Sequence, residues 1–117
     1  MHMARNYYAK DSIGTDIKDA TGEKVGQVED MVISPEGNVE FIVVSYDGIL
    51  GTTLADKLAA VPYNQCGWDE ADNCVTLSFT KDRLEQAPTF DKNNVPETSA
   101  DYYSESTSYY TGSRNAA

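Results

Sequence analysis

Two stretches near the middle of the chain have the hydrophobic pattern of β-strands. Residues 25–33 and 39–46 are rich in β-branched and aromatic side chains, which pack well on a pleated surface. Between them lies the sequence Ser-Pro-Glu-Gly-Asn, in which Pro35 presets φ for a turn and Gly37 supplies the positive φ that closes it. The pattern therefore predicts a β-hairpin.

The second arm of this hairpin carries hydrophobic side chains on both faces. Because side chains alternate along a strand, Phe41 and Val43 point one way while Ile42, Val44 and Tyr46 point the other. Such a strand needs a barrel interior on one side and a cover on the other, supplied by a helix, a loop or a second subunit. A twin subunit is the simplest way to bury Ile42 and Val44, so we expect a homodimer.

Two further strands are predicted toward the C-terminal side. Residues 58–63 form the first, with Pro62 marking its end or an edge position. Residues 74–79 form the second and show the cleanest alternation in the chain. That alternation places Val75, Leu77 and Phe79 inward and Cys74, Thr76 and Ser78 outward.

A short helix is predicted directly after these strands. Thr80 is placed to cap it, Phe79 and Leu84 occupy the two positions of a hydrophobic staple, and Pro88 stops the helix after Ala87. Strands nevertheless dominate the pattern. The expected fold class is mostly β: a small closed or partly open β-barrel of about six strands with one short C-terminal helix.

Composition divides the chain into a leader (1–11), a dense patterned block (12–91) and a polar tail (92–117). The tail is rich in Ser, Thr, Asn and Tyr, so it cannot bury enough apolar surface to offset its ordering entropy. We expect it to be flexible unless a partner orders it. Its tyrosine pairs at 102–103 and 109–110 are candidate anchors on another surface, since aromatic side chains dominate interface hot spots.

The net charge of −10 is concentrated in the central block. A surface of this sign repels phosphate backbones and anionic lipid headgroups, which disfavours direct binding of nucleic acid. No stretch approaches the roughly 20 apolar residues that span a bilayer, and the first ten residues lack the apolar region of a secretion signal. We therefore expect no membrane insertion and a cytoplasmic location.

The order of several short segments resembles the PRC-barrel family. This small β-barrel occurs in the cytoplasmic part of the photosynthetic reaction-centre H subunit, in the C-terminal half of the ribosome-maturation factor RimM, and as stand-alone bacterial proteins. The resemblance implies a barrel without catalytic residues or cofactors, which docks proteins or assists assembly and is often dimeric. The resembling segments are Ile13-Gly14, Asp16-Ile17, residues 22–26 and 28–30, residues 41–45, residues 48–51, residues 57–62 and residues 80–90.

The candidate binding residues are hydrophobic side chains in or near loops. Ile49 and Leu50 are flanked by Gly48 and Gly51, so this loop is predicted to expose a small apolar knob that docks a partner whose identity the sequence does not give. Trp68 is a weaker candidate, because core packing is the commoner fate of aromatic residues in a small domain.

The two cysteines, Cys66 and Cys74, lie on either side of an acidic loop. In a hairpin they would face each other at a separation that a disulfide can bridge, whereas a cytoplasmic location favours two reduced thiols. They do not form a zinc site, because no further Cys and no nearby His completes four ligands.

Carboxylates suggest a rival function, the binding of a small ligand or a divalent metal. The loop at residues 69–73 offers oxygen ligands but lacks the spacing of an EF-hand, so a solvated hairpin tip is the plainer interpretation. The barrel mouth is the other place for such a ligand. Glu29 and Asp30 are neighbours on a strand and would point to opposite faces, so we expect no catalytic pair, no active site and no metal site.

Overall fold

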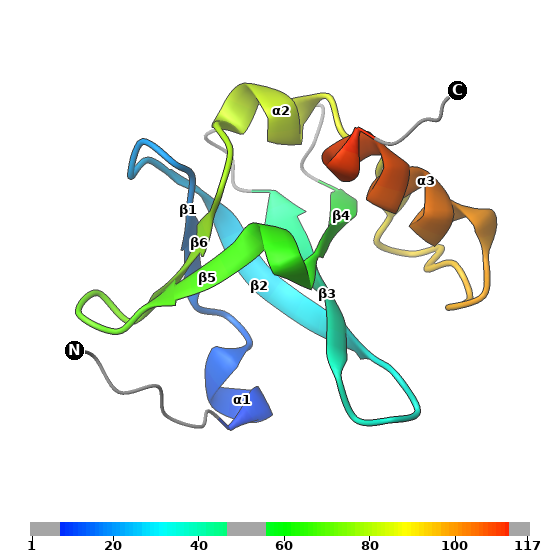
Figure 1. The fold of residues 1–117 in the computed structure, drawn as a ribbon, viewed down its shortest axis with the longest axis horizontal. Helices are drawn as coiled ribbons and strands as arrows, with labels where there is room; N and C mark the ends of the chain where they lie inside the picture. Colours follow the sequence, from blue (N-terminus) through cyan, green and yellow to red (C-terminus); the bar gives the residue numbers. More distant parts are fainter. Residues whose placement is uncertain (1–7, 47–55, 113–117) are drawn as a thin grey trace.

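The predicted hairpin forms the centre of a curled β-sheet. The computed structural model describes residues 8–46 and 56–112, in which seven strands follow the order β5-β6-β1-β2-β3-β4-β7 (Figure 1). The short strands β5 and β7 lie at the two ends of this order, so the barrel is partly open. The strands are β1 (Asp16–Lys18), β2 (Lys24–Ile33), β3 (Val39–Tyr46), β4 (Lys57–Pro62), β5 (Cys66–Asp69), β6 (Cys74–Leu77) and β7 (Phe90–Asp91).

Helices cover parts of this sheet. The short helix α1 (Ala9–Ser12) precedes β1, and a single 3-10 turn, η3 (Tyr63–Gln65), joins β4 to β5. Helix α2 (Lys81–Glu85) follows β6, and α3 (Asp101–Thr111) lies beside β4 (Figure 1). The mostly β fold class expected from the sequence is confirmed.

Strand β1 joins the two ends of the domain. It pairs antiparallel with β2, where Ile17 lies opposite Gly26, and parallel with β6, where Ile17 also lies opposite Val75. The first strand therefore sits between elements that are close to it in the sequence and elements almost sixty residues away. This pairing curls the sheet around the fully buried side chain of Ile17.

Glycine is required at Gly26 because two strands approach closely there. A Cβ at this position would lie 2.4 Å from the carbonyl oxygen of Ser45 on β3, which is far inside van der Waals contact. Gly26 and Tyr46 are register partners, so the contact lies where the hairpin enters the core.

The interior of the barrel holds the face of β3 that was expected to be covered by a twin subunit. Ile42 and Val44 are fully buried there, and Tyr46 donates its hydroxyl to the carbonyl oxygen of Leu84 over 2.7 Å. Val75, Leu77 and Phe79 join the same core, as predicted. Cys74, expected to point outward, is buried instead, whereas Thr76 on the same face of β6 is half-buried and Ser78 is exposed.

The outer face of β3 is covered by the same chain. Tyr103 of α3 packs against Phe41, with 5.2 Å between ring centroids, and both belong to a second buried cluster with Ala60. The reason given above for a homodimer is therefore incorrect: Ile42 and Val44 are buried inside one copy, and α3 shields much of the opposite face.

At residues 92–112 the structure differs from the flexible tail expected from composition. Three side chains of α3 are buried, Tyr103, Ser106 and Tyr110, at the 3- and 4-residue spacing of one helix face. The tyrosine pairs do act as anchors, but on the barrel of their own chain. This corrects the expectation over these residues; the last five residues of the chain lie outside the described part.

Polar contacts fix α3 at both of its ends. Near its start, the backbone N–H of Ala60 donates to the Tyr102 hydroxyl over 2.8 Å, and Ser106 donates its hydroxyl to the Ala60 carbonyl. Near its end, the guanidinium of Arg83 on α2 donates to the carbonyl oxygens of Tyr109 and Tyr110 over 2.8 and 2.9 Å. Arg83 thus satisfies carbonyls that the last turn of a helix leaves free.

Candidate functional site

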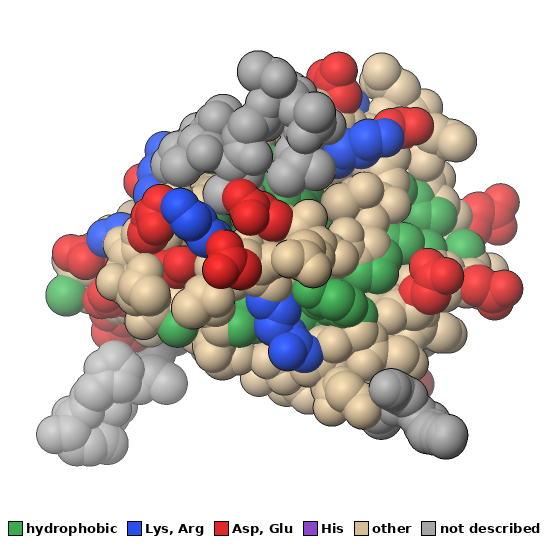
Figure 2. Space-filling model, turned by 90° about the horizontal axis from the view of Figure 1, so that it is seen from above, with side chains coloured by type: hydrophobic (Ala, Val, Ile, Leu, Met, Phe, Trp, Pro, Cys, Tyr) green, Lys and Arg blue, Asp and Glu red, His purple; other side chains and the backbone are tan. Residues whose placement is uncertain are grey.

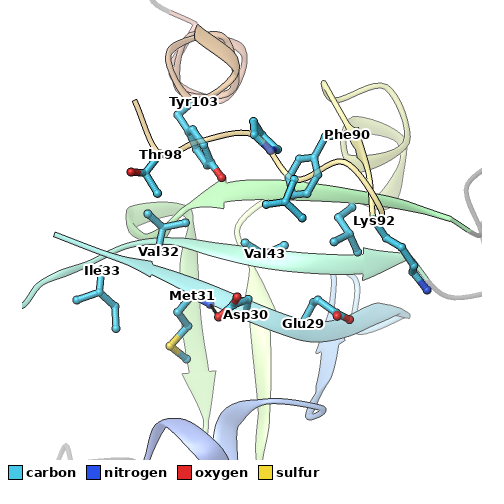
Figure 3. A pocket seen from close by; sticks show the side chains of 13 residues that line it. Glu29, Asp30, Met31, Val32, Ile33, Val43, Phe90, Lys92, Thr98 and Tyr103 are labelled. Carbon is cyan, nitrogen blue, oxygen red and sulfur yellow. Dashed lines mark hydrogen bonds between the residues drawn. The ribbon is translucent and has the colours of Figure 1, made fainter. Parts of the chain in front are cut away.

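A groove opens on the outer face of the sheet, next to the position of α3. It has a volume of about 280 Å³ and lies between strand β2 and the segment that follows β7 (Figure 3). Val43 and Leu58 line its sheet side, while Phe90, Pro96 and Tyr103 line the other side. The groove is therefore the part of the outer sheet face that α3 leaves uncovered.

The rim of the groove carries exposed hydrophobic side chains. Ile33 at the end of β2 is 56% exposed and Val95 in the segment after β7 is 61% exposed. Both side chains are large enough to stabilise a complex when a partner buries them. An apolar rim around an apolar hollow is typical of a surface that receives another molecule.

Two carboxylates stand on the β2 side of the same rim. Glu29 and Asp30 are both exposed and both line the groove, which corrects the expectation that they point to opposite faces. The physical reason is a register irregularity between Val28 and Asp30: a bulge breaks the alternation of the strand and re-aims the side chains.

The negative charge of this rim acts on its neighbours. Burial, and then the charge of Asp30, raise the pKa of Tyr103 above its ordinary value. Asp30 accepts the N–H of Met31 over 2.8 Å, and within the described residues neither Glu29 nor Asp30 forms an ion pair. Lys92 on the opposite side is the cation among the lining residues.

Of the binding residues expected from the sequence, only Trp68 belongs to the described part of the chain, and it does not line this groove. Ile49 and Leu50 lie outside the described residues. Trp68 is half-buried, donates its indole N–H to the Tyr63 hydroxyl over 3.0 Å and packs against the main core. Its surroundings are those of a core aromatic residue, which was the plainer interpretation.

The two cysteines are free thiols in the structure. In the β5–β6 hairpin Cys66 lies opposite Leu77 and Cys74 lies opposite Asp69, so the facing arrangement suggested for a disulfide is absent from this hairpin. Burial raises the pKa of the Cys66 thiol to about 12 and also raises the pKa of Cys74. Both groups are therefore held in the protonated, weakly nucleophilic form.

The carboxylates of the acidic loop are engaged in local contacts. Asp69 accepts the backbone N–H groups of Ala71 and Asp72, and the Asp72 carboxylate pairs with Lys18 over 3.2 Å. Throughout residues 8–46 and 56–112, no three His, Cys, Asp or Glu residues gather in a group suited to a metal ion. The loop has the contacts of a well-formed hairpin tip.

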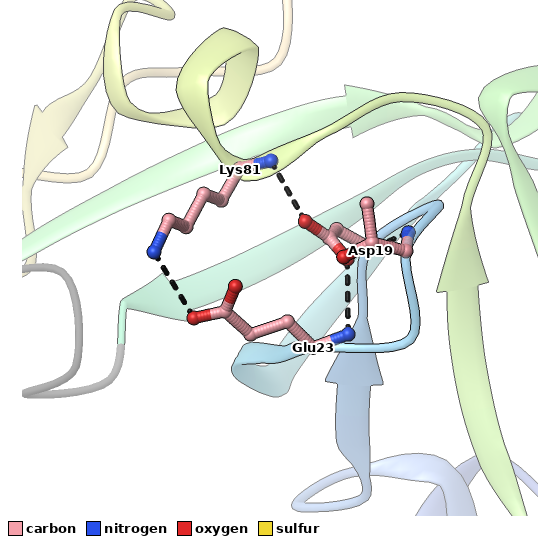
Figure 4. Close-up of polar contacts among 4 residues, drawn as sticks. Asp19, Glu23 and Lys81 are labelled. Carbon is pink, nitrogen blue, oxygen red and sulfur yellow. Dashed lines mark hydrogen bonds and ion pairs between the residues drawn. The ribbon is translucent and has the colours of Figure 1, made fainter.

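A different carboxylate, that of Asp19, is the most highly coordinated acid of the described chain (Figure 4). It accepts both the backbone N–H and the hydroxyl of Thr21, the N–H of Glu23, and the N–H of Lys81 at the start of α2. Lys81 in turn pairs with Glu23 over 3.0 Å. Burial works to raise the pKa of Asp19, but these hydrogen bonds together hold it below its ordinary value.

Asp19 also takes over a role that the sequence suggested for Thr80. Thr80 occupies the N-cap position of α2, but its side chain makes no capping hydrogen bond. The first free N–H of the helix, that of Lys81, is satisfied by Asp19 from the β1–β2 turn. The group is buried and its acceptors are filled, so we interpret it as a structural junction between the two ends of the barrel.

The surface charge is uneven. Viewed from the side of α2, acidic and basic side chains are interspersed over one part of the surface, while hydrophobic side chains gather over another part with acidic groups at its border (Figure 2). Four lysines are already held in ion pairs with carboxylates: Lys18, Lys24, Lys57 and Lys81. The surface that a partner would contact therefore carries an excess of carboxylates over cationic side chains.

These features define a small, partly open β-barrel with a filled interior and an apolar groove on its outer face. The PRC-barrel domain family model matches residues 4–83, well over half of the chain, and the chain belongs to that family. No curated protein matches it. The match confirms the family resemblance found in the sequence, and it ends before Phe90, Val95 and α3, so one wall of the groove comes from chain beyond the match.

Proposed function

We propose that this protein is a non-enzymatic module that docks other proteins or assists their assembly. Membership of the PRC-barrel family supports such a role at the level of the family. The observation that carries the proposal for this chain is the groove, because its rim leaves Ile33 and Val95 more than half exposed. Large exposed apolar side chains grouped around a hollow are commonly buried by a partner.

The test compares which partners are captured by the unchanged protein and by a variant whose groove rim has been made polar. The double variant Ile33→Asp, Val95→Asp places charges on exposed positions and is expected to fold, while it loses partners that the unchanged protein retains from its native cell. Ile13→Asp is the matched control, because Ile13 is also an exposed large hydrophobic residue, at 43%, but lies outside the groove. Retention of the same partners by the double variant would contradict the proposal.

Self-association, expected from the sequence, is a separate proposal within the same class. A second copy is not needed to cover β3, since α3 covers the Phe41 face, although the groove still leaves apolar surface free. Light scattering at tens of micromolar concentration decides this point. A monomer would leave the docking of a different protein as the function.

The proposal extends to the class of partner and to location. A net charge of −10 disfavours nucleic acid as a partner, because binding would bring like charges together. We also propose a cytoplasmic location, and in the described part of the chain no helix combines the length and hydrophobicity needed to cross a membrane.

The rival function, a metal or small-ligand site at the acidic loop, draws no support from carboxylates that are already engaged by Ala71, Asp72 and Lys18.

A further inference from the structure

We infer that the groove recognises a partner segment in which one aliphatic side chain lies between Lys or Arg residues. This inference rests on the proposed function and adds to it the chemistry of the partner. It is carried by the groove together with the two carboxylates that the bulge of β2 places on its rim.

The hollow has the size of an anchor site rather than of a cofactor site. Its volume of about 280 Å³ lies just below the roughly 300–1,000 Å³ of typical small-molecule pockets. Its inner surface is apolar where it is formed by Val43, Leu58 and Phe90. An aliphatic side chain placed there would also contact Ile33 and Val95 at the rim, so that both would be buried in the complex.

The rim selects for positive charge beside that anchor. Glu29 and Asp30 stand next to each other on the β2 side of the groove without an ion pair among the described residues, and Tyr103 lines the opposite side. Lys92 balances part of this charge. The whole molecule adds to the selection, because a net charge of −10 attracts basic segments and slows the approach of acidic ones.

The same charge argues against a second copy of this chain as the occupant. Each copy carries the same net charge of −10, and like charges at an interface are unfavourable. A basic segment of a different protein fits both the shape and the charge.

The first test uses synthetic peptides as probes. A fluorescein-labelled peptide Gly-Lys-Arg-Leu-Arg-Lys-Gly is compared with the same peptide carrying Ala for Leu, and with one carrying Glu for every Lys and Arg. At low ionic strength we expect NMR shift changes to centre on Val43, Phe90 and Tyr103. We expect the Ala peptide to bind about fivefold more weakly, because it buries less apolar surface, and the Glu peptide not to bind.

The second test separates local charge from net charge. The variant Glu29→Lys, Asp30→Lys is expected to weaken binding of the Leu peptide about tenfold and to flatten its salt dependence. The control Glu70→Lys, Asp82→Lys changes the net charge by the same amount away from the groove, and it is expected to keep binding within about twofold. Equal losses in the two variants, or shift changes outside the groove, would overturn the inference.

Failure of this inference is distinguishable from failure of the proposed function. If native partners depend on Ile33 and Val95 but the basic peptides do not bind, docking at the groove stands and the partner chemistry is wrong. If the groove variants abolish a dimer seen by light scattering, the occupant is a second copy and the inference is wrong. If peptides bind as expected but no native partner depends on the groove, the recognition chemistry holds and the proposed cellular role fails.

Discussion

Ser106 donates its hydroxyl to the carbonyl oxygen of Ala60, a residue 46 positions earlier in the chain. Ala60 also donates its N–H to the Tyr102 hydroxyl, so both of its backbone groups are bonded by side chains of one helix. Strand β7 pairs with β4 only at Lys57 and Leu58, which leaves the following part of β4 as a sheet edge. Helix α3 closes that edge with hydroxyl groups in place of another strand.

Removing one hydroxyl is expected to open this edge. Tyr102→Phe leaves the Ala60 N–H without its acceptor, and we expect the free energy of unfolding to fall by about 1–2 kcal/mol. Hydrogen exchange of the Ala60 amide, followed by NMR, should become faster in the variant. Tyr8→Phe is the control, because Tyr8 is 79% exposed and lies at the start of α1 rather than on α3. Unchanged exchange at Ala60 in Tyr102→Phe would show that the tail does not protect the edge.

The Asp19 junction predicts a specific pH dependence. Because hydrogen bonds lower the pKa of Asp19 in the folded protein, ionised Asp19 stabilises the fold above its unfolded pKa of about 3.9, and this contribution is lost as the pH falls through the folded value. Asp19→Asn should cost about 2 kcal/mol near neutral pH, since an amide N–H₂ then faces the Lys81 N–H. Urea unfolding should show this difference shrinking as the pH falls below the unfolded pKa of about 3.9. A constant difference across the pH range would contradict the ionic role.

The close approach at Gly26 predicts an intolerance to any side chain. Gly26→Ala would place its Cβ 2.4 Å from the Ser45 carbonyl oxygen, so β2 and β3 would have to separate, at a cost of about 2 kcal/mol or more. Gly67→Ala is the matched control in another strand, because its Cβ meets only the Thr76 hydroxyl, at 3.1 Å. Thermal unfolding should therefore rank the Gly26 variant well below the Gly67 variant. The reverse order would contradict the register of the hairpin.

The raised thiol pKa values predict inert cysteines. Burial raises the pKa of Cys66 to about 12, so almost no thiolate is present at pH 8 and alkylation by iodoacetamide should be slow in the folded protein. In denaturant both cysteines should react at the rate of a free thiol. Mass spectrometry after this treatment should find two modified thiols without prior reduction. Modification only after reduction would show that Cys66 and Cys74 form a disulfide.

The sequence predicted the parts of the fold that depend on local pattern. The turn around Pro35 and Gly37 and the two apolar faces of β3 were visible from single residues and their spacing. The cover of the outer face was assigned to a twin subunit, because a tail of low hydrophobicity gives little reason to expect a docked helix. One signal was present: the pairs at 102–103 and 109–110 are seven residues apart, which places them on the same side of a helix.

The groove was beyond reach of the sequence for a different reason. Its two walls come from β2 and from the segment around Val95, which only the folded chain brings together. The pair Glu29 and Asp30 was judged by the alternation of a regular strand, and a bulge cancels that rule. A bulge depends on the register between two strands, and that register cannot be predicted from the sequence of one strand alone.

The parallel pairing of β1 with β6 constrains how this domain is made. Ile17 can pair with Val75, and Asp19 can accept the N–H of Lys81, only after the ribosome has synthesised most of the barrel. Strands β1, β2 and β3 can pair early, since they are adjacent in the sequence, but the other edge of β1 must wait for β6. During synthesis Ile17 and the inner face of β3 therefore stay exposed until β6 and α2 are available, and the outer face of β3 stays exposed until α3 has been made. That interval is when nascent chains would depend most on chaperones.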